Sequence, residues 1–151
     1  MDYDQTYSGK IEMRLWFDGI EQPSAVKKLM GNGRFTGFLV EPYAAFLSGE
    51  DFLHVDRKGF DLESLGEMPN REVKSFTPHG AKLGPSTFYG AGRKADPLLF
   101  EQTIAPSKDF IVVDQTKLAT TGEVHLVLKR GADVAKIGHS VSYSHRDKLF
   151  S

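Results

Sequence analysis

The sequence lacks cysteine, long apolar runs and any large excess of charge of one sign. Without cysteine, the chain has no disulfide, no thiol nucleophile and no cysteine-based zinc site. No apolar run approaches the 18 residues of a membrane span, so we expect no membrane association. The first residues are acidic and show no apolar signal region, and together with the missing cysteine this favours a cytoplasmic protein. A net charge of −1 argues against a generic nucleic-acid binder.

The 151 residues suffice for one domain with its own core. Alternation of apolar and polar residues predicts strands over residues 11–17, 52–55, 60–62, 71–76, 110–114 and 123–129. A helix is expected over residues 23–30, with Ser24 as a candidate N-cap and a stop at residues 31–33. A second helical face runs through residues 38–47, where Pro42 requires either a start near Glu41 or a kink. The expected fold is a single α/β domain with a central mixed sheet flanked by helices.

Most of the segment from residue 77 to residue 108 is expected to be loop, since it holds four prolines and four glycines, with a short helix near residues 96–102. The pattern after residue 134 is ambiguous between helix and strand. No repeat and no linker divides the chain.

Three ionisable residues in the middle of the chain form the most informative pattern. Asp61 lies on one predicted strand, and Glu72 and Lys74 lie two positions apart on the next strand, so their side chains share one face. The turn-rich residues 66–70 allow these two strands to pair. Two carboxylates and an ammonium group at one point are what a hydrolase needs to hold a hard divalent metal and a nucleophilic water. An exposed ion pair of Lys74 without any catalytic role is the alternative.

This arrangement resembles the PD-(D/E)XK nuclease superfamily, which includes many restriction endonucleases and the mismatch-repair nuclease MutH. The matching residues are Asp61 and then Glu72-Val73-Lys74, preceded by a segment with a glycine-rich start, residues 32–41, that ends in Glu41. The resemblance covers roughly residues 31–114 in the order of helix with Glu, hairpin with Asp, strand with Glu-x-Lys and a further buried strand. It implies a restriction-endonuclease-like fold.

The resemblance further implies an Mg²⁺-dependent DNA endonuclease, with Mn²⁺ as a substitute. Asp61, Glu72 and the Val73 carbonyl would bind the metal, Lys74 would orient the attacking water, and Glu41 would hold a second metal or a metal-bound water. A homodimer is expected for cleavage of both strands, and a monomer for a nicking enzyme.

A Ser/Thr-rich stretch follows the Glu-x-Lys strand, with a faint similarity to MutH-like nucleases. The candidate DNA-binding residues there are Lys82, Ser86, Thr87, Tyr89, Arg93 and Lys94. Hydroxyl, aromatic and basic side chains of this kind contact the DNA backbone. Anchoring of the loop to the core and surface solubility are equal alternatives for these residues. A non-catalytic β-rich binding or assembly module remains the alternative function for the whole chain.

Overall fold

A strand that is buried along its whole length, β8 (Asp109–Asp114), lies in the middle of the sheet. The computed structural model describes residues 1–57 and 59–150. In it, the strands of the main sheet follow the order β1-β9-β8-β6-β5-β4, and β7 and β10 extend the sheet beyond β6. β6 and β8 are parallel, and the other pairs are antiparallel, so the sheet is mixed. The predicted α/β class with a mixed central sheet is confirmed.

The strands of the structure are β1 (Thr6–Lys10), β2 (Trp16–Phe17), β3 (Ile20–Glu21), β4 (Phe52–Arg57), β5 (Phe60–Ser64), β6 (Arg71–Thr77), β7 (Gly80–Lys82), β8, β9 (Glu123–Lys129) and β10 (Ser140–Val141). The helices are α1 (Pro23–Met30), α2 (Gly33–Ser48), α3 (Pro97–Leu99), α4 (Leu118–Thr121) and α5 (Gly131–Ile137). Shorter helical turns are η1 (Ser86–Phe88), η2 (Phe100–Ile104), η3 (Ala105–Ser107) and η4 (Tyr143–Lys148).

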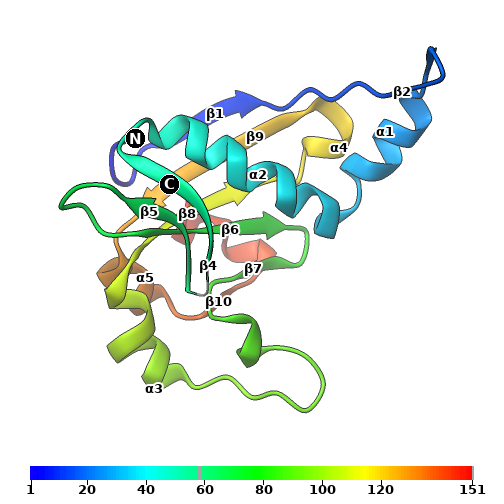
Figure 1. Cartoon of the computed structure of the whole chain (residues 1–151). Coiled ribbons are helices and arrows are strands. Elements are labelled where there is room, and N and C mark those ends of the chain that lie inside the picture. The colour runs from blue at the N-terminus through cyan, green and yellow to red at the C-terminus, as the bar shows by residue number, and fades with distance from the viewer. Residues whose placement is uncertain (58, 151) are drawn as a thin grey trace.

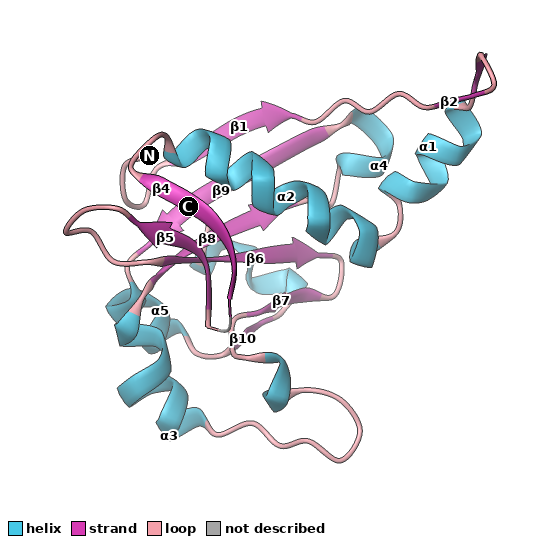
Figure 2. Ribbon diagram, in the orientation of Figure 1, coloured by secondary structure: helices cyan, strands magenta, loops and turns pink. Residues whose placement is uncertain are grey.

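Alternation along β8 divides the core between the two faces of the sheet. Phe110 and Val112 pack into one apolar cluster with residues from β7, η1, η2, α5 and the C-terminal end of the chain. Ile111 and Val113 pack into a second cluster beneath α1, α2 and α4. Figure 2 shows α1, α2 and α4 on one side of the strands, with α3 and α5 toward the lower end. Each face of the central sheet is therefore covered, as a strand with no exposed residue requires.

Helix α2 begins at Gly33, earlier than the sequence indicates. The side chain of Asn32 caps it by accepting hydrogen bonds from the backbone N–H groups of Arg34 and Phe35. Pro42 lies in the interior, so of the two alternatives the start near Glu41 is wrong and the helix continues through the proline. A proline there removes the N–H that would bond to Phe38, at about 3 kcal/mol. The exposed position of Pro42 leaves that carbonyl open to water.

The strand predicted over residues 11–17 is mostly absent. Residues 11–15 are extended, with half-buried Ile11, Met13 and Leu15 alternating with exposed side chains, but they belong to no ladder. The alternation arises because one side of this segment packs against the protein, and such packing does not require a partner strand. The ladder at this edge is instead formed by β1, which pairs with β9 and which the sequence did not indicate.

The other predicted elements fit the structure with small changes. The strands at residues 52–55, 60–62, 71–76, 110–114 and 123–129 are confirmed as β4, β5, β6, β8 and β9. Helix α1 is confirmed, although Gln22 rather than Ser24 holds the N-cap position. The segment 77–108 contains the short strand β7 and several helical turns besides loop. Among the described residues, no helix has the length and apolar character needed to cross a bilayer.

Candidate active site

The site begins where strands β5 and β6 separate. The described register between them is the pair Leu62↔Arg71, and the ladder does not continue past it. At the next position, Oδ2 of Asp61 accepts a hydrogen bond of 2.8 Å from the backbone N–H of Val73. The carboxylate of Asp61 thus accepts the N–H that a backbone carbonyl of β5 would accept in a regular ladder. The carbonyl of Val73 faces the same gap, because the N–H and C=O of one residue in an extended strand point to the same neighbour.

Glu72 stands beside Asp61 across this junction. Leu62 and Arg71 form the neighbouring pair, so Asp61 and Glu72 share the opposite face of the sheet. Lys74 follows on that face, and its Nζ lies 3.0 Å from Oε1 of Glu72. The structure therefore places three of the predicted catalytic residues on one face, at the point where the two strands diverge.

Lys108 is a fourth charged residue here, and the sequence did not single it out. Its side chain is buried, it forms an ion pair with Oε2 of Glu72, and its Nζ donates a 2.6 Å hydrogen bond to the carbonyl of Gly59. Each carboxylate oxygen of Glu72 thus contacts one ammonium group. The only signal in the sequence was a lysine just before the buried strand β8, where a charge without a partner would be costly.

The backbone that carries Lys108 is fixed by close packing of α5. A Cβ on Gly131 would approach the carbonyl oxygens of Ala105 and Lys108 to 1.9 and 2.0 Å, so a glycine is required there. The N–H of Gly131 also points at the carboxylate of Asp109, which begins β8. Helix α5 therefore holds the start of β8, and with it Lys108, at a set distance from Glu72.

The carboxyl of Asp61 has an unusual acidity. Burial raises its pKa from 3.8 to about 6, and the hydrogen bond from the Val73 N–H opposes that rise. The nearby carboxylates of Glu41 and Glu72 raise the pKa further, and Lys74 lowers it. A bound cation stabilises a carboxylate more strongly when like charges lie beside it and little solvent reaches it than when the carboxylate is exposed.

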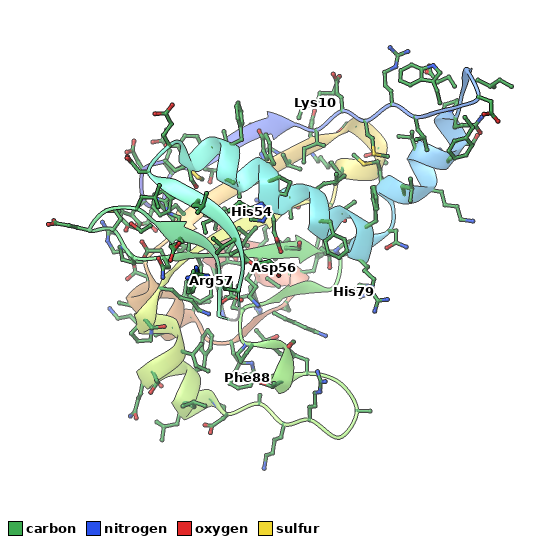
Figure 3. The ribbon with its side chains drawn as sticks, in the orientation of Figure 1. Lys10, His54, Asp56, Arg57, His79 and Phe88 are labelled. Atoms are coloured by element: carbon green, nitrogen blue, oxygen red, sulfur yellow. The ribbon has the colours of Figure 1, made fainter. Side chains whose placement is uncertain are left out.

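Glu41 approaches the site from helix α2. Its carboxylate lies 3.2 Å from Nε2 of His54 on β4. The register of strand β4 is irregular between His54 and Arg57. This irregular part of β4 lies opposite Asp61. Glu41, His54, Asp56 and Asp61 together line a cavity of about 370 Å³. Figure 3 shows His54 and Asp56 close to each other along β4, and neither was among the predicted site residues.

The site offers a divalent cation few protein ligands. Within residues 1–57 and 59–150, no group of three or more His, Asp or Glu side chains is close enough to hold one ion. Asp61 keeps one oxygen, Oδ1, without a hydrogen-bond donor from the described chain. Two carboxylates and a backbone carbonyl, completed by water and phosphate oxygens, are a donor set that suits Mg²⁺, which binds through one or two carboxylates. In chemical type these residues suit Mg²⁺, and a cation at Glu72 has to displace the two ammonium groups that hold its oxygens.

The loop after β7 begins next to the site and carries the predicted DNA contacts other than Lys82, which ends β7. Nζ of Lys74 donates a 3.0 Å hydrogen bond to the carbonyl of Gly84, which ties the start of this loop to β6. The exposed members of the predicted set are Lys82, Ser86, Thr87, Arg93 and Lys94.

Tyr89 differs from the other predicted contacts. It is half-buried, its hydroxyl donates to the His139 carbonyl at 2.6 Å, and it accepts from the N–H of Gly84. Burial raises its pKa. The only proton of this hydroxyl is already used inside the fold, whereas Lys82 lies over the ring from outside.

Comparisons with protein-family models, with curated proteins and with solved structures found no match to this chain. The site is therefore interpreted from its own geometry.

Proposed function

We propose that this protein is an Mg²⁺-dependent DNA endonuclease of the PD-(D/E)XK type. The single observation that carries the proposal is the placement of Asp61, Glu72 and Lys74 on one face, where β5 and β6 part and an Asp61 oxygen replaces a backbone acceptor. The element order also agrees with the resemblance. A helix with Glu41 precedes three antiparallel strands, and a helical segment leads to a strand parallel to the Glu-x-Lys strand. Figure 1 allows this path to be followed from cyan to yellow.

In the proposed site, Asp61, Glu72 and the carbonyl of Val73 would hold the metal. A magnesium ion bound there would polarise the scissile phosphate and acidify an attacking water. Lys74, fixed between Glu72 and the Gly84 carbonyl, directs an N–H bond toward that water and toward the negative charge that develops on phosphate. The pKa of Asp61 places its ionisation near pH 6, so activity should rise with pH through that region.

Lys108 gives the proposed site a feature of its own. Its ammonium and that of Lys74 neutralise Glu72 in the metal-free protein. A cation at Glu72 must therefore compete with two ammonium groups, and this favours an ion that arrives together with the phosphate anion. The exposed basic residues Arg93 and Lys94 lie on the loop that starts at the site, and phosphate contacts there would position the duplex.

The test is incubation of supercoiled plasmid with the protein in Mg²⁺ or Mn²⁺. We expect nicked or linear product from wild type, none from Lys74→Ala, and none in EDTA. Lys28→Ala is the matched control, because this lysine is exposed on α1, which packs on the opposite face of the sheet from Glu72 and Lys74. Equal cleavage by wild type and Lys74→Ala would remove the basis of the proposal. A protein that neither cleaves nor responds to metal would instead be the β-rich binding module.

A further inference from the structure

A small hairpin projects from the molecule at the start of α1. Strands β2 and β3 pair through Trp16↔Glu21 and Phe17↔Ile20, and Asp18 and Gly19 at the tip have φ values of 50° and 80°. Two positive φ values at an Asp-Gly tip are typical of the tight turn that matches strand twist. Figure 1 shows β2 at the end of the ribbon farthest from α3 and α5.

The hairpin is held in shape by its own contacts. Nη2 of Arg14 donates to both carboxylate oxygens of Glu21, at 2.9 and 3.2 Å, and the guanidinium lies 5.2 Å from the centroid of the Trp16 ring. The N–H of Gln22 closes the base by bonding to the Leu15 carbonyl at 2.8 Å. A segment ordered in advance loses little conformational entropy when it binds.

This ordered hairpin exposes three large apolar side chains. Trp16 is 51% exposed, Phe17 is 54% exposed and Ile20 is 67% exposed. Single exposed apolar residues are ordinary, but several together on one projection mark a contact surface. No element within residues 1–57 and 59–150 covers them.

A groove of about 750 Å³ lies beside the stem of the hairpin. Its apolar wall consists of Ile11, Met13, Val26, Met30, Leu118 and Ala119. Its charged lining consists of Lys10, Arg14 and Lys27 with one acid, Glu12. One wall is the stem of the hairpin itself, and residues 16–21 are not among the lining residues. The hairpin of a given chain therefore lies outside the groove of that chain.

We propose that the hairpin of a second copy of this chain occupies the groove, and that the exchange is reciprocal. The tip matches the groove in chemistry, because it combines apolar side chains with the acid Asp18, whereas the apolar groove carries the base Lys27. The other charges of the two surfaces are neutralised within the chain, since Arg14 pairs with Glu21 and Lys10 with Glu12. An exchange in which each copy gives a hairpin and receives one has twofold symmetry and closes as a dimer.

The area agrees with a specific but weak dimer. A half-exposed aromatic side chain offers roughly 100 Å², so the three side chains of one hairpin expose about 300 Å². Two hairpins and the two grooves that receive them would remove about 1,200 Å² from solvent, at the lower end of specific interfaces. Affinity depends on the few large side chains of an interface more than on its area, and with three such side chains per hairpin we expect association in the micromolar range. The inference does not depend on nuclease activity.

Trp16 is the only tryptophan, so it reports on its own burial. The experiment follows the fluorescence of the metal-free, DNA-free protein over a dilution series, together with its sedimentation equilibrium. We expect a monomer–dimer equilibrium, with tryptophan emission that moves to shorter wavelength as the dimer forms. A monomer at every concentration through the micromolar range would overturn the proposal, as would a dimer whose Trp16 emission does not change.

Two pairs of exposed residues give matched variants. Ile20→Ser alters the hairpin, and Leu65→Ser is its control, since Leu65 is 62% exposed on the turn after β5. Lys27→Glu alters the groove, and Lys28→Glu is its control, since the neighbouring Lys28 does not line the groove. We expect Ile20→Ser and Lys27→Glu to raise the dimer dissociation constant by roughly tenfold or more, with both controls unchanged. Unchanged dimerisation of Ile20→Ser, or a Trp16 response only to added duplex DNA, would refute the exchange.

Discussion

Replacement of Asp61 by asparagine should stabilise the protein at neutral pH. Burial raises the pKa of this carboxyl from 3.8 to about 6, so the folded state disfavours the charged form. A difference of about 2 units corresponds to about 3 kcal/mol, at about 1.4 kcal/mol per unit. Because the side chain is only partly buried, we expect Asp61→Asn to raise the free energy of unfolding by about 1–3 kcal/mol. The Asn oxygen can still accept the N–H of Val73.

The sign of this effect depends on pH. Between about pH 4 and pH 6 the folded protein binds a proton at Asp61 that the unfolded chain releases, so the stability of wild type falls as the pH rises through this window. The gain from Asp61→Asn should therefore be complete above pH 6 and absent near pH 4. Thermal and urea unfolding in EDTA at pH 4, 6 and 8 measures it, with a rise in Tm of about 3–10 °C expected at pH 8.

Asp56→Asn is the matched control for this experiment, because Asp56 is an exposed carboxylate in the same cavity. We expect the stability of that variant to stay within about 0.5 kcal/mol of wild type. Lower stability of Asp61→Asn at pH 8, or an equal gain at pH 4 and pH 8, would refute the reasoning.

Further substitutions test the surroundings of the site. Glu72→Gln leaves two ammonium groups without their carboxylate, and because these side chains are largely buried we expect urea unfolding without metal to show a loss of about 2–4 kcal/mol. Glu63→Gln, which breaks the exposed pair with Arg57, should lose under about 1 kcal/mol, and an equal loss in both variants would contradict the account. Gly131→Ala should strongly lower Tm, because its Cβ would collide with two carbonyl oxygens. Gly37→Ala meets nothing within 4 Å in α2 and should stabilise by about 0.5–1 kcal/mol, so similar Tm values for the two alanine variants would argue against this packing.

The central strands could be predicted because the pattern of apolar and polar residues within each strand is sufficient, without knowledge of its neighbours in the fold. β8 and β9 are apolar runs bounded by polar residues, and β6 places Glu72 and Lys74 two positions apart, which fixes their shared face whatever surrounds the strand. The edge of the sheet could not be predicted in this way. β1 is polar and contains Gly9, whose missing side chain admits the hydroxyl of Tyr43, so its place depends on a contact with α2 that lies far along the chain.

The candidate site was predictable only in part for the same reason. Asp61 and Glu72 come from strands joined by a short turn, so local pattern brings them together. Lys108 reaches Glu72 only because β8 runs parallel to β6, and a parallel neighbour is reached through a long connection that carries no local signal. His54 meets Glu41 because it pairs with Leu62 on the sheet face that α2 covers, and this packing of α2 is a tertiary contact that the sequence of β4 does not reveal.

The most direct test of the central claim is a calorimetric titration with Mn²⁺, in the presence of a short DNA duplex and at pH 8, where Asp61 is ionised. The account predicts that wild type binds the ion through Asp61 and Glu72, and that Asp61→Asn, although at least as stable, loses this binding. Equal binding of the ion by wild type and Asp61→Asn would contradict the account.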